Sequence, residues 1–250
     1  MLNSEALNTT EFLDHISLDC VIFGFHENEL KVLALHYKTT KEYALPGGFV
    51  RKDESLENAA KRVLKQRTGL DNIFLKQFGI FSDPARSNMN PAVKDILELG
   101  SDVDINFFDQ RFISVGFYAL VEYTKVNPTP DFISDSCLWI NIKDDIQLLL
   151  DHNHIITKAL EVLRVQLNYQ PIGYNLLPEK FTMPELQKLY ETILGKELDR
   201  RNFQRKILSY KILDKLDERR HGGAHKSPYL YAFNLENYQK ALNDGLTGGW

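Results

Sequence analysis

Apolar and polar residues alternate through much of the first two thirds of the chain, which is typical of β-strands with one buried face. Leu18–Phe25 and Leu30–His36 alternate in this way and are joined by a short polar stretch, so they predict a β-hairpin. Later segments of the same character are Ala44–Val50, Ile73–Ile80, Arg111–Tyr123 and Ser136–Ile142. The pattern therefore predicts a first domain built on a sheet.

Helical spacing of apolar residues is clearest in Leu56–Arg67, where Asp53 or Ser55 can cap the start and Gly69 can end the helix. Further helices are predicted at Ala92–Leu99, Asp144–Leu150 and Ile155–Leu167, with Asp151 or Asn153 in the break between the last two. Strands and helices in this order predict an α+β sandwich.

The pattern changes after residue 168, where Pro171, Gly173 and Pro178 interrupt regular structure. Two helices, Met183–Leu194 capped by Thr182 and Arg200–Tyr210 capped by Asp199, are followed by the basic loop Glu218–Pro228 and the strand Tyr229–Asn234. This is the order of a winged helix-turn-helix. We therefore expect two domains, residues 1–168 and 169–250.

Charge separates the two halves. The net charge of −4 divides into −7 up to Asn175 and +3 from Leu176 onward, which indicates different partners. No apolar run approaches the roughly 20 residues of a membrane-spanning helix, and the first 14 residues lack the basic and apolar segments of a secretory signal. A cytoplasmic protein with no membrane partner and with reduced thiols at Cys20 and Cys137 is expected.

The stretch Gly48–Leu70 resembles a Nudix box. Its glycine, glutamate, arginine and closing aliphatic–glycine–aliphatic positions are filled in the correct frame by Gly48, Glu54, Arg62, Leu64, Gly69 and Leu70. The resemblance covers residues 14–168 and implies the Nudix fold, an α/β/α sandwich. Within the box, Arg62 is expected to hold the loop in place, while Glu54 and Glu57 are expected to be solvated or capping charges.

Three departures from the box remove its chemistry. The resemblance implies glutamates that bind Mg²⁺ or Mn²⁺ at positions where this chain has Val63, Gln66 and Arg67. Hard cations need anionic oxygen ligands, and Arg67 puts a positive charge in their place. We therefore expect no enzyme activity, no catalytic residues, no metal and no cofactor, and a retained pocket suggests binding instead.

The C-terminal part resembles the winged helix of Nudix-related transcriptional regulators, through Pro171–Pro178, Phe181-Thr182, Leu189-Tyr190-Glu191 and Arg200–Phe203. That family includes bacterial repressors of NAD biosynthesis and Bacteroidetes regulators of arabinose and xylose catabolism, and it implies a homodimer. A double-stranded DNA operator is the expected partner. Candidate DNA contacts, on the second helix and the basic loop, are Arg200, Arg201, Asn202, Gln204, Arg205, Lys206, Arg219, Arg220, His221 and Lys226.

The Nudix-like domain is expected to sense a small molecule beside the box. Candidate effector contacts are His36, Lys38, Phe49, Asp83, Arg86, Arg111 and Tyr118. ADP-ribose would need two or more arginines for its diphosphate. The nearest match to the family's Arg-Asp-Pro-Arg-like stretch is Asp109-Gln110-Arg111, with Asp83-Pro84-Ala85-Arg86 earlier and an insertion between the two. This departure favours a pentose such as arabinose or xylose, or a sugar-derived metabolite, over ADP-ribose. His152 and His154 are expected to be loop residues rather than metal ligands.

Two other functions remain open at this point, besides an ADP-ribose-sensing NAD regulator. One is a Nudix hydrolase of ADP-ribose or another nucleoside diphosphate derivative, using displaced carboxylates such as Asp83, Asp102 or Asp104. The other is an interaction module whose second domain docks protein rather than DNA.

Overall fold

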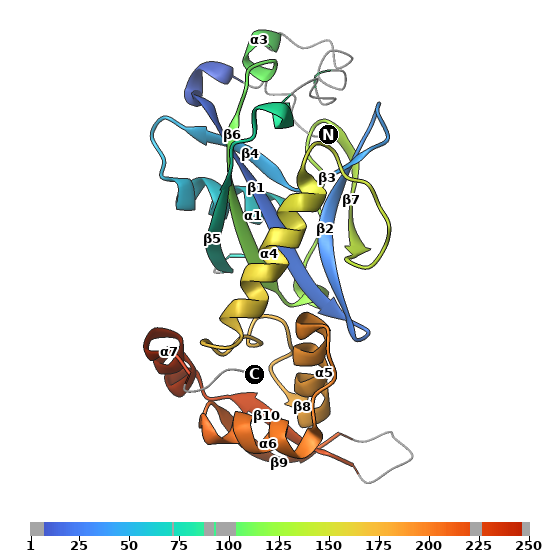
Figure 1. Ribbon diagram of the computed structural model, residues 1–250, viewed down its shortest axis with the longest axis vertical. Helices are drawn as coiled ribbons and strands as arrows, with labels where there is room; N and C mark the ends of the chain where they lie inside the picture. The colour runs from blue at the N-terminus through green and yellow to red at the C-terminus, as the bar shows by residue number, and fades with distance from the viewer. Residues whose placement is uncertain (1–7, 72, 88–92, 94–103, 221–226, 247–250) are drawn as a thin grey trace. The chain divides into compact units, whose positions relative to one another are not determined.

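A computed structural model describes residues 8–71, 73–87, 93, 104–220 and 227–246 (Figure 1). The chain forms two compact units, Met1–Gly24 with Lys31–Ala159, and Phe25–Leu30 with Leu160–Trp250. This division falls earlier than residue 168, inside a helix, and places the first hairpin turn with the second unit. The compact units thus divide between Ala159 and Leu160, and the domain boundary between residues 168 and 169 stays a prediction.

The first unit is built on a sheet of seven strands within the described residues. They are β1 (Phe12–His26), β2 (Glu29–Tyr37), β3 (Tyr43–Ala44), β4 (Gly47–Arg51), β5 (Phe74–Phe81), β6 (Ile113–Val121) and β7 (Ser134–Asn141). The main path is β3-β2-β1-β6-β5, while β4 pairs with β1 and β7 pairs with β2. The β1–β6 pair is parallel, with Ile16 opposite Ile113, and the β1–β4, β2–β3, β2–β7 and β5–β6 pairs are antiparallel.

Two helices, α1 (Leu56–Thr68) and α4 (His152–Gln166), cover this sheet. The unit also contains the single-turn helix α3 (Ile105–Phe108) and 3₁₀ turns at Thr9–Glu11, Pro84–Ser87 and Tyr123–Lys125. In Figure 1, α1 lies behind the sheet and α4 crosses in front of it. The apolar face of α1, including Ala60, Val63 and Leu64, packs on alternate β1 residues such as Leu18 and Cys20. Asp19, which lies between those two, therefore belongs to the other side of the strand.

The local signals of the box helix are confirmed. Ser55, not Asp53, caps α1, since its side chain accepts a hydrogen bond from Asn58 N, and Gly69 ends the helix with φ of 74°. The preceding Gly47 is needed for close approach of two strands, because a Cβ there would lie 2.8 Å from the Leu18 carbonyl oxygen.

One predicted helix is wrong. Asp144–Leu150 is irregular, and Leu150 has a φ of 53°. The Asn153 side chain accepts from Leu148 N at 2.7 Å and donates to the Ile146 carbonyl at 2.8 Å, so it takes up backbone groups that a helix would have paired. His152 and His154 lie in the first turn of α4 rather than in a loop. The helix expected at Ala92–Leu99 falls, apart from Val93, on residues that the structure does not describe.

The second unit contains the winged helix-turn-helix order. Its elements are β8 (Phe181–Thr182), α5 (Met183–Leu194), α6 (Arg200–Ser209), β9 (Leu213–Arg219), β10 (Tyr229–Phe233) and α7 (Leu235–Asp244), with sheet order β8-β10-β9. The caps at Thr182 and Asp199 are confirmed, and Thr182 forms a full capping box with Glu185. The sequence patterns did not predict β9 or α7. Glu218 and Arg219, which were expected in the basic loop, are the last two residues of β9.

Candidate functional site

A cavity of about 350 Å³ lies beside the box in the first unit. This volume is at the lower end of the range of small-molecule sites. Its walls come from β1, β2, β4, α1, α3 and the segments around residues 86, 131 and 150. The residues that matter below are Phe12, Asp19, Phe49, Arg51, Arg62, Gln66, Arg67, Arg86, Phe108, Phe112, Asp131 and His152.

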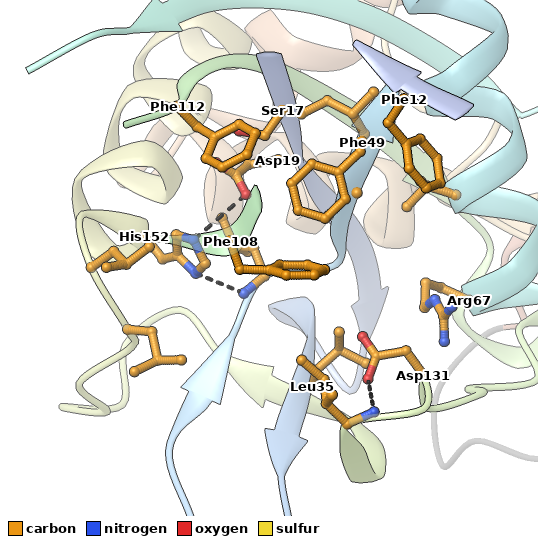
Figure 2. Close-up of a pocket in the computed structure, with 18 of the residues that line it drawn as sticks. Phe12, Ser17, Asp19, Leu35, Phe49, Arg67, Phe108, Phe112, Asp131 and His152 are labelled. Atoms are coloured by element: carbon orange, nitrogen blue, oxygen red, sulfur yellow. Dashed lines mark hydrogen bonds and ion pairs between the residues drawn. The ribbon is translucent and has the colours of Figure 1, made fainter. Parts of the chain in front are cut away.

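Aromatic rings form the apolar wall of this cavity. Phe49 has ring centroids of Phe108 and Phe112 at 5.5 and 5.2 Å, and that of Phe12 at 5.8 Å. Figure 2 shows the rings of Phe49, Phe108 and Phe112 turned toward the same space as Asp19 and His152. A planar ring can stack in such surroundings.

A buried ionic network forms another wall. Arg86 donates from Nε and Nη2 to the two Asp151 oxygens, each at 3.0 Å, and from Nη2 to Asp19 Oδ2 at 3.0 Å. Ser114 Oγ donates to the same Asp19 oxygen at 2.6 Å. Burial opposes the charge of Arg86, but Asp151 and Asp19 raise its pKa overall. Arg86 is therefore a neutralised, fixed part of the wall.

His152 completes this network. Its Nδ1 accepts from Leu45 N at 3.0 Å, which leaves the proton of the neutral ring on Nε2, 3.5 Å from Asp19 Oδ1. Burial lowers the pKa of His152. The ring is thus held neutral and fixes the orientation of the Asp19 carboxylate.

Arg62 and Glu54 hold the box loop together. Arg62 Nε donates to Glu54 Oε2 at 3.1 Å, and Nη2 donates to the Phe49 carbonyl at 2.8 Å. Glu54 also accepts from Arg51 N at 2.8 Å. Burial opposes ionisation of Glu54, but these hydrogen bonds lower its pKa overall. The expected role of Arg62 in holding the loop is confirmed. The Glu54 carboxylate is not a solvated charge, because it binds Arg62 and the Arg51 backbone N–H and so fixes the same loop.

The predicted effector residues divide into two groups. Phe49 and Arg86 line the cavity. The other five do not. His36 binds Asp135 at 2.7 Å, Lys38 donates to the Phe132 carbonyl, Arg111 donates to the Ser82 carbonyl, and Tyr118 is fully buried against Phe23, Phe74 and Phe78. Asp83 lines a separate, open cavity together with Arg86, Asp151 and His154.

Sequence reasoning missed Phe12, Asp19, Phe108, Phe112, Asp131 and His152 as cavity residues. Only Asp19 carries a local signal, because a single carboxylate interrupts the apolar strand segment Leu18–Phe23. The phenylalanines look like ordinary core residues in sequence.

The second unit displays a basic helix face. Phe203 and Ile207 of α6 are buried, with the Phe203 ring 5.4 Å from Tyr190 of α5, while Arg200, Arg201, Asn202 and Arg205 are exposed. Gln204 and Lys206 are half-buried. Asn202 Oδ1 accepts from Arg205 Nη2 at 3.0 Å. Leu208 is 40% exposed.

The turn between α5 and α6 is fixed by side chains. Gln187 donates to the Leu198 carbonyl at 2.9 Å and to Glu191, whose carboxylate accepts from Leu198 N at 3.0 Å. Because both backbone groups of Leu198 are held, the start of α6 has a defined direction relative to α5.

Two of the DNA contacts predicted on the basic loop, Arg219 and Arg220, already contact other side chains. Arg219 packs on the Tyr229 ring, 4.0 Å from its centroid, and Arg220 forms an ion pair with Glu185 at 3.2 Å. His221 and Lys226 lie outside the residues that the structure describes.

Comparison with known proteins agrees with this two-part organisation. Residues 14–159 match the NUDIX domain family, and residues 173–233 match the NrtR DNA-binding winged helix domain. The chain is 26% identical over 230 residues to the ADPR-responsive transcriptional repressor NtrR of Acinetobacter baylyi, covering 89% of this chain and 83% of that protein.

Solved structures show the same fold. The DNA complex of Shewanella oneidensis NrtR is 24% identical, with a TM-score of 0.74 over 95% of this chain and 100% of that chain. A MutT/nudix family protein from Enterococcus faecalis is 21% identical, with a TM-score of 0.64 over 89% of this chain and 87% of the other. No helix among residues 8–71, 73–87, 104–220 and 227–246 is long and apolar enough to cross a membrane.

Proposed function

The chain belongs to the Nudix family and carries an NrtR-type winged helix after its Nudix domain, and on that premise we propose that it is a DNA-binding transcriptional repressor that responds to ADP-ribose. The similarity to an ADPR-responsive repressor extends over 89% of the chain and includes both domains. This similarity favours ADP-ribose over the sugar effector that the sequence patterns suggested.

The observation that carries the DNA-binding part is the division of α6 into two faces. Phe203 and Ile207 anchor the helix, and Arg200, Arg201 and Arg205 project into solvent near its start. Recognition helices present their first turns to base edges in the major groove. Arginine reads guanine there and also neutralises phosphate.

The chemistry of the cavity supports the effector. The Phe49, Phe108 and Phe112 rings suit an adenine, since aromatic stacking is favourable and independent of hydrogen-bond pattern. Asp131 can accept from ribose hydroxyls. Arg51 and Arg67 supply positive charge for a diphosphate.

The proposed function is that of a sensor and not of a hydrolase. The box residues do not fit Mg²⁺, because Val63 is apolar and 2% exposed, Glu54 is bound by Arg62, and Arg67 is cationic. No group of three or more possible metal ligands occurs in the described part of the chain. Of the displaced carboxylates, Asp83 lines the other cavity, Asp104 accepts from Asn106 N, and Asp102 is not described.

We further propose a homodimer, which the family resemblance implies and which suits an operator with two half-sites. Sedimentation of the full chain at micromolar concentration tests this. A monomer with unchanged DNA affinity would contradict it.

DNA binding is tested by fluorescence anisotropy with DNA from upstream of the protein's own gene. Arg201→Ala and Arg205→Ala should weaken binding, whereas Lys240→Ala, the same loss of charge on exposed α7, should not. ADP-ribose should change the affinity of the wild-type protein, and arabinose or xylose should not. If all three variants bound DNA with equal affinity, α6 would not be the recognition helix. If only arabinose or xylose changed the DNA affinity, the effector would be a sugar and not ADP-ribose.

A further inference from the structure

We infer that Arg67 takes the place of the divalent cation of an active Nudix box and binds the diphosphate of the effector directly, so that effector binding needs no metal. This rests on the proposed function, because it assumes a diphosphate-containing effector. It goes further by assigning one side chain to the diphosphate and by excluding a metal from recognition.

Two of the four cavity arginines are already neutralised. Arg62 is bound by Glu54, with N–O distances down to 2.5 Å, and Arg86 is bound by Asp19 and Asp151. A guanidinium fully engaged by carboxylates has little to offer a second anion. A diphosphate entering this cavity therefore has to find its positive charge elsewhere.

Arg67 is charged, lines the cavity and has no ion pair among the described residues. The one hydrogen bond that its side chain makes to these residues runs from Nη1 to the Thr129 carbonyl at 3.1 Å. Its Nε is buried and has no hydrogen-bond partner within the described ranges. A buried donor without an acceptor is costly and calls for an absent partner such as an ion or ligand.

The backbone holds Arg67 in this position. Thr129 N donates to the Arg67 carbonyl at 3.0 Å, and Asn127 N donates to the Thr68 carbonyl at 3.0 Å. The end of α1 is thus fixed to the segment that also carries Asp131. Nε and Nη2 form the edge of the guanidinium that donates no hydrogen bond to the described residues, and such an edge is the fork that matches two phosphate oxygens.

The same position explains why a cation is not expected. A guanidinium at the end of the box helix repels Mg²⁺ and, unlike a carboxylate, cannot coordinate it. Apart from Arg62, Arg86 and Asp19, which are held in ion pairs, the other charged residues that line the cavity are Arg51, which adds positive charge, and Asp131. The Asp131 carboxylate accepts from Ile133 N at 3.2 Å. Figure 2 shows Asp131 and Arg67 as neighbours on the cavity wall. The diphosphate is therefore assigned to the Arg67 side of the cavity, and the Asp131 carboxylate is assigned to accept hydrogen bonds from the ribose hydroxyl groups.

The test is calorimetric titration of the full-length protein with ADP-ribose, once in EDTA and once in Mg²⁺. The wild-type protein should bind equally well in both. Arg67→Gln should bind roughly 10- to 100-fold more weakly, as expected for loss of charge-assisted hydrogen bonds. Adenosine, which lacks the diphosphate, should bind both proteins alike. Lys65→Gln, the same charge change on an exposed residue of the same helix, should match the wild type.

A second variant addresses the metal itself. Arg67→Glu restores a carboxylate, so its ADP-ribose binding should be weak in EDTA and recover in part when Mg²⁺ is added. If Arg67→Gln fails to fold by thermal melting, Arg67→Lys serves instead. Lysine keeps the positive charge but lacks the paired N–H donors of the guanidinium, so this variant should bind ADP-ribose several-fold more weakly than the wild-type protein.

The outcomes separate the two ideas. A wild-type protein that binds no ADP-ribose in either buffer defeats the proposed effector and this inference with it. Wild-type binding that needs Mg²⁺, or that survives Arg67→Gln unchanged, overturns the inference and leaves the effector in place.

Discussion

Replacing Arg86 with methionine should destabilise the Nudix domain by about 3–5 kcal/mol, the usual cost of removing one member of a buried ion pair. The Arg86 and Asp19 side chains are only 4% and 10% exposed. Methionine fills a similar volume, so the loss is electrostatic. It leaves the Asp19 carboxylate with the Ser114 hydroxyl and the neutral His152 ring as partners.

Urea unfolding measures this loss. Trp139 lies in the first unit and reports on it, and a Trp250→Phe background removes the other tryptophan. The two units need not unfold together, so the Trp139 transition is fitted by itself. Lys65→Met is the control: its ion pair with Asp71 joins side chains that are more than 60% exposed, and its loss should cost no more than about 1 kcal/mol.

A double variant checks the reasoning. Adding Asp19→Asn to Arg86→Met removes the more deeply buried of the two carboxylates that lose their cation, so the pair should cost less than the sum of the single variants. Two results would contradict a stabilising buried ion pair: an Arg86→Met loss no greater than that of Lys65→Met, or additive losses for Arg86→Met and Asp19→Asn.

Three further predictions concern other parts of the molecule. Burial lowers the pKa of His152, so the unfolded chain binds the extra proton first and stability falls as pH drops below about 6.5; His152→Gln should flatten that loss between about pH 7.5 and 5.5 in urea titrations, and parallel curves would contradict this. Thr182→Ala removes the α5 capping box and should cost the winged helix about 1 kcal/mol in thermal unfolding, unless α5 starts elsewhere. Leu208 lies one helical turn beyond Arg205 on the exposed face of α6, where it can touch a thymine methyl. One thymine-to-deoxyuridine change in the operator should weaken wild-type binding but not that of Leu208→Ala, and equal losses in both proteins would exclude the contact.

Much of the fold was predictable where local chemistry and tertiary environment agree. The α1 helix combines an apolar face, a serine cap and a closing glycine, so its position follows from the sequence. β9 was missed because Leu213–Arg219 carries mostly charged residues and is little buried, leaving no alternation to detect. The helix predicted before α4 failed because one side chain, Asn153, captures the backbone of that segment.

The candidate site was less predictable, because a cavity is made by residues far apart in sequence. The degenerate box positions Val63, Gln66 and Arg67 were identified from spacing alone, and all of them line the cavity. The partners of Arg86 could not be foreseen, since Asp19 and Asp151 come from opposite ends of the domain. Tyr118 was expected to contact the effector, but its position on a central strand buries it.

The parallel pairing of β1 with β6 has a consequence for synthesis on the ribosome. Ile16 cannot meet Ile113 until roughly a hundred further residues have been made, so the central sheet closes late, as expected for contacts of high sequence separation. Until then β2 and β4 can already pair with β1, but the edge of this apolar strand that later pairs with β6 stays open. The winged helix, whose β8 and β10 are close in sequence, closes over a much shorter span. A nascent chain stalled before residue 113 should therefore depend on chaperones, and one stalled after α4 has left the exit tunnel should not.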